Sequence, residues 1–124
     1  VSAHTNRCAV ENGHTVCRII EFENDPGLDA SIAALRSWTG AESVRGLPSS
    51  PSKPLVYMDA PDRPQPRRDV NAGKGMTVSV GRVRKDPLFH IRLVAMGHNT
   101  IRGAAGGSVL NAELLASTGV IPPA

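Results

Sequence analysis

The stretch MTVSVGRVRKDPLFHIRLVAM, residues 76–96, decides the fold. Apolar and polar side chains alternate on both sides of its Lys-Asp-Pro-Leu centre, which is typical of two strands joined by a turn. We therefore predict strands over residues 76–84 and 89–96, joined through residues 85–88. The residues of the second strand that would share one face are Phe89, Ile91, Leu93 and Ala95.

An Asn-Gly pair near the beginning of the chain predicts a hairpin. Asn-Gly supplies the positive φ angles of a tight turn, so residues 5–10 and 15–23 are predicted as strands joined at 11–14. With a two-residue loop, Arg7 and His14 would lie on one common face. An arginine can bind a carboxylate through two parallel hydrogen bonds, and a neutral imidazole can accept a proton. A histidine beside a turn is more often a solvated surface group, so the residues alone leave both interpretations open.

The same hairpin would place Cys8 opposite Cys17. A cross-strand disulfide is conceivable there, and two small buried thiols are the simpler alternative. His4 and His14 complete a local set of metal-ligating residue types, but their spacing matches no common zinc pattern. We therefore predict no metal site.

The middle of the chain is predicted as helix, loop and strand. A short helix begins at or near Asp29 and ends at Trp38, with a loop over 41–53 and a strand over 55–58. The apolar stripe of that helix consists of Leu28, Ile32 and Leu35.

The segment DRPQPRRD, residues 62–69, is predicted as an extended arm and not as a helix. Pro64 and Pro66 remove backbone donors and bias the residues before them toward extended geometry. The short run AGKG at 72–75 lacks the first glycine and the Lys-Ser/Thr step of a phosphate-binding loop.

A last helix is predicted over residues 98–117. Its apolar positions at helical spacing are Ile101, Ala105, Val109 and Ala112. Its first turns contain Gly103, Gly106 and Gly107. Each glycine disfavours a helix interior by about 1 kcal/mol relative to alanine, so we expect close approach of another backbone or of a ligand.

Composition indicates one compact domain. The chain has 124 residues, of which 40% are hydrophobic and 3% aromatic, and it carries a formal net charge of +3. One core built from aliphatic side chains is the expectation, in an α+β domain with a mixed or antiparallel sheet and flanking helices. Because aromatic residues are few and the basic residues are scattered, binding to nucleic acid is disfavoured. The absence of a long apolar run disfavours a membrane-spanning segment, and we expect a cytoplasmic location. We also expect the chain to be a piece of a longer protein.

Four ordered motifs resemble the aspartate-semialdehyde dehydrogenases. HNTIRGAA at 98–105, followed by LNAELL, is similar to the closing helix of that family, in which an Asn lies four residues before Gly-Ala-Ala. SAHTNR followed by NGHT, residues 2–15, resembles its arginine and histidine segment, with the same seven-residue step. PDRPQPR at 61–67 and SVGRVRKDPL at 79–88 are similar to the fungal and archaeal branch. The resemblance covers essentially the whole chain.

The resemblance implies a site and a reaction. Arg7 would bind the substrate carboxylate, and His14 would be the acid/base beside a catalytic cysteine. Asn99 and Gly103 would contact NADP where an exposed helix start offers free N–H groups. The implied activity is the reductive dephosphorylation of aspartyl phosphate to aspartate semialdehyde, in amino-acid biosynthesis toward lysine, threonine and methionine. Neither Cys8 nor Cys17 lies in a sequence that resembles the segment around the family's nucleophilic cysteine.

The resemblance also implies a domain organisation. Residues 1–97 would be part of the catalytic and dimerisation domain of a dehydrogenase related to glyceraldehyde-3-phosphate dehydrogenase. Residues 98–124 would return to a nucleotide-binding Rossmann domain outside these residues. Expected partners are a small-molecule substrate, that nucleotide-binding domain or chain, and a second copy in a homodimer or tetramer. The chain alone should be inactive.

Two other functions stay open. A malonyl- or succinyl-CoA reductase would share the scaffold and act on a thioester. A non-catalytic dimerisation module would tolerate substitution of Arg7 and His14 without consequence.

Overall fold

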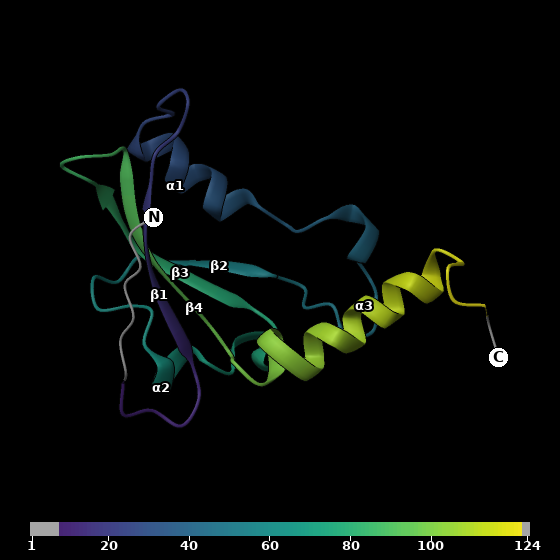
Figure 1. Cartoon of the computed structure of the whole chain (residues 1–124). Helices are drawn as coiled ribbons and strands as arrows, with labels where there is room; N and C mark the ends of the chain where they lie inside the picture. The colour runs from purple at the N-terminus through teal and green to yellow at the C-terminus, as the bar shows by residue number, and fades with distance from the viewer. Residues whose placement is uncertain (1–7, 123–124) are drawn as a thin grey trace.

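A mixed four-stranded sheet forms the centre of the molecule. The computed structural model describes residues 8–122, and the strand order is β1-β4-β3-β2 (Figure 1). The strands are β1 His14–Ile20, β2 Leu55–Met58, β3 Val78–Lys85 and β4 Ile91–Gly97. β4 pairs antiparallel with both β1 and β3, whereas β2 pairs parallel with β3. The predicted α+β class and mixed sheet are confirmed.

The pair β3–β4 is the core of the sheet, as the alternating pattern predicts. Val80, Ile91 and Leu93 are buried side by side on one face. Phe89 does not join them, because it lies in the turn before β4 and is 44% exposed. Its backbone N–H donates to Asp86 Oδ1, which holds the residue in the turn. The predicted shared face is therefore wrong at Phe89 and right for the residues that follow.

The predicted N-terminal hairpin is wrong. Residues 8–13 form no strand, residues 5–7 lie outside the described part, and β1 pairs with β4 instead. The type I′ hairpin turn that Asn-Gly favours needs positive φ at both central residues, and of this pair only Gly13 has it (φ 112°). The antiparallel ladder with β4 pairs every residue of β1, from His14 to Ile20, with a residue of β4.

Cys8 and Cys17 are both exposed free thiols. Neither a disulfide nor a pair of buried thiols is formed. Cys8 lies in the irregular segment before β1, and Cys17 lies on an edge strand, which has a neighbouring strand on one side only.

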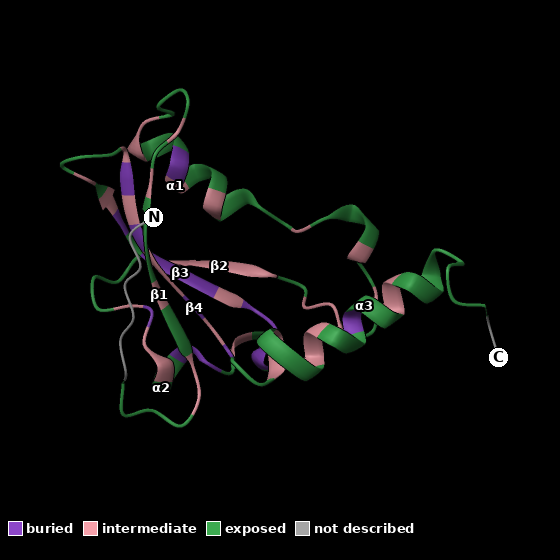
Figure 2. Ribbon diagram, in the orientation of Figure 1, coloured by how far each residue is buried: buried purple, intermediate pink, exposed green. Residues whose placement is uncertain are grey.

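Helix α1, Leu28–Ser37, covers one face of the sheet (Figure 1). Leu28, Ile32 and Leu35 pack against the buried residues of β3 and β4, which confirms the predicted helix and its apolar stripe. We call this side of the sheet the α1 face. Figure 2 shows burial concentrated along β3 and β4, while β1 is largely exposed.

The segment at 62–69 contains a short helix, contrary to the prediction of an extended arm. Helix α2, Pro66–Asp69, begins with its proline at the first helical turn, where a missing N–H costs nothing. Asp69 is 3% exposed and accepts hydrogen bonds from the Gln65 N–H (2.6 Å) and Arg63 Nε (2.8 Å). The Arg63 guanidinium holds the pKa of Asp69 below its usual range.

The last helix begins with a wide turn. The π-helical turn η3, Ile101–Ala105, leads into α3, Gly106–Ser117, so the predicted helix is confirmed with a different first turn. A Cβ on Gly106 would lie 2.5 Å from Met76 Sδ, and one on Gly107 would lie 2.7 Å from the Arg102 carbonyl. Close packing within the chain therefore explains these two glycines.

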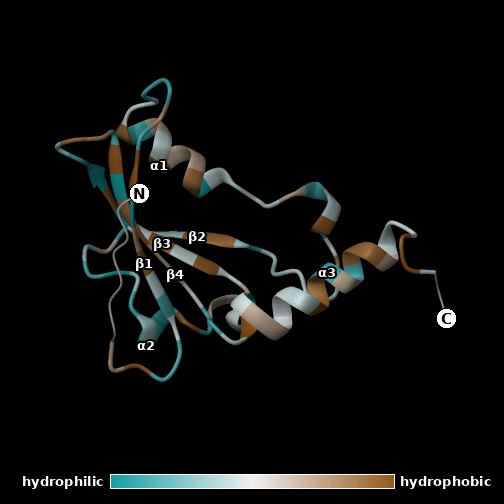
Figure 3. Cartoon of the chain, in the orientation of Figure 1, coloured by the Kyte–Doolittle hydropathy of each residue, from teal (hydrophilic) through white to brown (hydrophobic). Residues whose placement is uncertain are grey.

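Beyond its start, α3 projects away from the sheet, and several apolar residues lie along it (Figures 1 and 3). Val109 is 50% exposed and Leu115 41%. Within residues 8–122, no helix has the length and apolar character needed to span a bilayer. In the same part of the chain, no three His, Cys, Asp or Glu side chains gather as a metal site.

Candidate functional site

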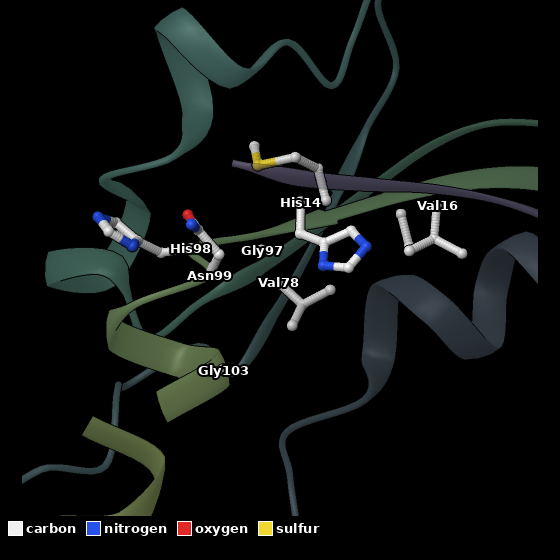
Figure 4. Close-up of a pocket in the computed structure, with 9 residues that line it drawn as sticks. His14, Val16, Val78, Gly97, His98, Asn99 and Gly103 are labelled. Atoms are coloured by element: carbon white, nitrogen blue, oxygen red, sulfur yellow. The ribbon is translucent and has the colours of Figure 1, made fainter. Parts of the chain in front are cut away.

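A pocket of about 290 Å³ opens where β1, β4 and the start of the last helix meet. It contains three of the four predicted site residues, namely His14, Asn99 and Gly103 (Figure 4). The fourth, Arg7, lies outside the described residues. The rest of the lining is Val16, Val78, Ala95, Met96, Gly97 and His98. The pocket is thus largely apolar, with a few polar groups at one end.

His14 is placed by the sheet. It is the first residue of β1, pairs with Gly97 of β4, and shares the α1 face with Val16 because strand side chains alternate. Its side chain is exposed, and in Figure 4 its ring lies between Val16 and Asn99. An exposed imidazole above an apolar floor is accessible to a reacting group and can exchange a proton with it.

Asn99, which lies just before the last helix, is bonded to the segment just before β1, next to His14. Its Oδ1 accepts a hydrogen bond of 3.0 Å from the backbone N–H of Gly13. Because a backbone N–H is only a donor, this bond fixes which end of the amide is oxygen. The Nδ2 group then remains, with no hydrogen-bond partner among the described residues.

Gly103 differs from the other glycines of the helix. Among the described residues, a Cβ placed on it would meet only the His98 carbonyl, at the ordinary contact distance of 3.6 Å. Packing between residues 8 and 122 therefore does not require glycine at this position, although it does require glycine at 106 and 107. Open space over a glycine at a pocket wall leaves room for a group from outside the described residues.

His98 is the residue that sequence reasoning missed. It is 6% exposed, and its Nδ1 accepts from the N–H groups of Thr100 and Ile101 at 3.3 Å each. Its carbonyl accepts from the Gly103 N–H at 3.0 Å. In Figure 4 its ring points away from His14. A side-chain acceptor directly before a helix is the signal that indicates such a role.

The first turn of the helix therefore does not offer the free N–H groups that the resemblance implied. Three of its N–H groups are already bonded to His98. What the pocket offers a ligand is the Asn99 amide, the open surface over Gly103 and the apolar floor. Its volume lies just below the usual range for small-molecule sites, which is enough for one ring-sized group.

Comparison with known proteins is in accord with the motifs. The family model for the semialdehyde dehydrogenase dimerisation domain matches residues 1–102. The aspartate-semialdehyde dehydrogenase of Archaeoglobus fulgidus is 43% identical over 121 residues, and that of Saccharomyces cerevisiae is 42% identical over 123. Each alignment covers 98% of this chain and 34% of the relative. The chain thus spans about one third of the length of these relatives, and the predicted resemblance to the archaeal and fungal branch is confirmed.

Solved structures agree in fold. The aspartate-semialdehyde dehydrogenase of Candida albicans, determined with NADP, superposes with a TM-score of 0.77 at 42% identity, covering 88% of this chain and 31% of that one. Aspartate-semialdehyde dehydrogenase II of Vibrio cholerae gives 0.66 at 27% identity, covering 86% and 28%. With a family model matched over most of its length and a sheet that superposes on these enzymes, the chain belongs to the semialdehyde dehydrogenase dimerisation-domain family.

Proposed function

We propose that this chain is the C-terminal portion of an NADP-dependent aspartate-semialdehyde dehydrogenase and is inactive alone. The enzyme would convert aspartyl phosphate to aspartate semialdehyde, a step of amino-acid biosynthesis. The observation that carries the proposal is that one pocket brings His14 together with Asn99 and Gly103. These residues come from opposite ends of the chain, and all three lie in motifs that resemble this family.

His14 would handle a proton. In the implied reaction a cysteine thiolate from the rest of the enzyme displaces phosphate from the substrate and forms a thioester. His14 would take the thiol proton beforehand and keep the thiolate beside it. Its exposure at the pocket mouth, with no hydrogen-bond partner among the described residues, leaves the ring accessible for this role.

Arg7 would fix the substrate. A guanidinium holds a carboxylate with two parallel hydrogen bonds, which sets the direction of the reacting carbonyl. This role rests on the resemblance of residues 2–15, since Arg7 lies outside the described residues.

Asn99 and Gly103 would hold the nicotinamide end of the cofactor. The Asn99 Nδ2 group can donate to a ligand carbonyl, and Gly103 lets a flat ring lie close to the backbone. Bound NADPH supplies the hydride that reduces the thioester. The apolar side chains under His14 offer a flat ring a surface to pack against.

Residues 98–124 would pack on the nucleotide-binding domain of the complete enzyme. The exposed apolar residues of α3, including Val109 and Leu115, support this, because a surface helix rarely exposes several large apolar residues without a partner. Residues 1–97 would belong to the catalytic and dimerisation domain.

The complete enzyme would be a homodimer or a homotetramer. The matched family is named for dimerisation, and the edge strand β1 exposes 60% of Ile19 on the face opposite α1. We expect Ile19→Lys to lower the assembled fraction in size-exclusion chromatography with light scattering. The exposed Leu88, which lies in the turn before β4, supplies the matched control Leu88→Lys.

The experiment that tests the function is a steady-state assay of the complete enzyme. His14→Ala should lower kcat by about 10²- to 10⁴-fold, the range for loss of a general acid or base. Arg7→Ala should raise the KM for substrate by about 10- to 100-fold, the loss of a charged bidentate contact. Thr15→Ala is the matched control, because Thr15 is exposed on the other face of β1. Turnover of malonyl-CoA or succinyl-CoA in preference to aspartyl phosphate would overturn the substrate assignment.

A further inference from the structure

We propose that Asn99 is also a positioning residue for His14, and that it links the cofactor end of the pocket to the proton-transferring end. This inference rests on the proposed function and goes beyond it. One end of the Asn99 amide is bonded to the residue directly before His14, and the other end remains for a ligand. A single side chain therefore joins two parts of the site.

The hydrogen bond lies where β1 begins. Gly13 N–H and Asn99 Oδ1 are 3.0 Å apart, and the two residues are 86 positions apart in the sequence. Among residues 8–122, this is the only side-chain hydrogen bond made to the 8–13 segment. The ladder with β4 starts at the next residue, where His14 pairs with Gly97. Strand ends fray more readily than strand centres, so a bond here acts mainly on the position of His14.

Gly13 lies in a crowded place beside this bond. Its φ is +112°, and a Cβ added to it would lie 2.7 Å from Pro66 Cβ. Pro66 begins α2, whose last residue Asp69 is buried and bonded to Arg63. Pro66 thus leaves room for no side chain at residue 13, and the hydrogen bond from Gly13 N–H to Asn99 is what fixes the backbone there.

The geometry has a consequence for catalysis. A general base must lie within hydrogen-bond reach of the proton it takes, and a displacement of about 1 Å can cost about 10²-fold in rate. Loss of the Asn99 acceptor frees Gly13 and with it the first residue of β1. Loss of the Asn99 donor weakens only the contact with the ligand. The two ends of one amide therefore affect two different kinetic constants.

Two substitutions separate these effects in the complete enzyme. Asn99→Leu removes both the acceptor and the donor, and should lower kcat by about 10- to 100-fold as well as raise the KM for NADPH. Asn99→Asp keeps an acceptor for the Gly13 N–H and loses the donor, so it should recover most of the lost kcat while the KM for NADPH stays high. If both variants lose kcat equally, the positioning role is wrong.

An exchange measurement tests the bond without turnover. Amide hydrogen exchange at Gly13, measured on the enzyme free of cofactor, should be slow in the parent and in Asn99→Asp and fast in Asn99→Leu. Equal exchange in all three would show that Asn99 does not hold Gly13, and would overturn the inference.

A double-variant cycle separates failure of the inference from failure of the proposed function. If Asn99 acts on kcat through His14, Asn99→Leu has no further effect on kcat in a His14→Ala background, although it still raises the KM for NADPH. A full additional loss of kcat in that background would overturn the inference alone. A His14→Ala enzyme with unchanged kcat would overturn the proposed function itself.

Discussion

Glu113 in α3 accepts two hydrogen bonds from Ser49, which lies 64 residues earlier in the chain. The Ser49 backbone N–H donates to Oε2 at 2.9 Å, and its Oγ donates to Oε1 at 2.7 Å. Both residues are half-buried. This pair ties the middle of α3 to the loop before β2, and so sets the direction in which the helix leaves the pocket.

Glu113→Ala should therefore loosen α3 more than it disturbs the sheet. Two hydrogen bonds to a partly exposed carboxylate are lost, for which we expect about 1 to 2 kcal/mol of destabilisation in urea unfolding. Asn111→Ala, exposed on the same helix, is the control. The variant should also raise the KM for NADPH in the complete enzyme. Unfolding midpoints that coincide for Glu113→Ala and Asn111→Ala would contradict the anchoring role.

The buried Asp69 should make acid stability depend on the α2 segment. The ion pair with Arg63 lowers the pKa of Asp69 in the folded chain, while the unfolded value is about 3.9. A lowered pKa adds stability that is present above the unfolded pKa and is lost as the pH falls through the folded pKa. Asp69→Asn should be less stable at pH 7, with a difference that shrinks below about pH 4.

Thermal unfolding of parent and Asp69→Asn across pH 2 to 7 measures this dependence. Asp62→Asn serves as control, because its carboxylate is exposed and lies 3.6 Å from Arg68. A stability difference between parent and Asp69→Asn that stays constant through the acid range would show that the ion pair does not respond to protonation.

Two glycines of the last helix should respond to alanine in opposite ways. Gly107→Ala places a Cβ 2.7 Å from a backbone carbonyl, and the resulting strain should destabilise the chain by about 1 to 3 kcal/mol. Gly103→Ala meets only an ordinary contact, so its stability should be unchanged or slightly higher. Its Cβ would narrow the pocket, however, and should weaken NADPH binding.

Calorimetric unfolding and cofactor titration of both variants test the contrast. A Gly103→Ala variant that binds NADPH as tightly as the parent would show that Gly103 is not part of the cofactor site. A Gly107→Ala variant of unchanged stability would mean that the helix moves enough to accept the added methyl group.

The 124-residue chain expressed alone should give no NADP-dependent turnover of aspartate semialdehyde in the presence of phosphate. In the proposed enzyme the nucleophile and the nucleotide-binding domain would belong to the rest of the protein, so the short chain would offer an imidazole without the thiolate that it serves. Addition of the remaining two thirds as a separate polypeptide should restore activity if the two parts associate. Sustained turnover by the short chain alone would contradict the proposal.

Local pattern was enough to predict α1, the strand pair of residues 76–96 and the last helix. Alternation and helical spacing are properties of neighbouring residues, and the turn at Asp86 is encoded in the same few positions. The same local reasoning failed at α2, because Pro66 is a helix breaker in the interior and a good first residue. It also failed at the Asn-Gly pair, because a turn signal does not state which strands pair, and β1 pairs with β4.

The sequence by itself determined the main helices and strands, namely α1, the β3–β4 pair and the last helix, and its motifs identified the family and the candidate residues. Only the tertiary structure decided that β1 pairs with β4, and that His14 and Asn99 therefore meet in one pocket. It also decided that His98 occupies the N–H groups of the helix start. The physical reason is that periodicity states which face of an element is apolar, whereas the partner of that face is chosen by packing and hydrogen bonding between segments distant in the chain.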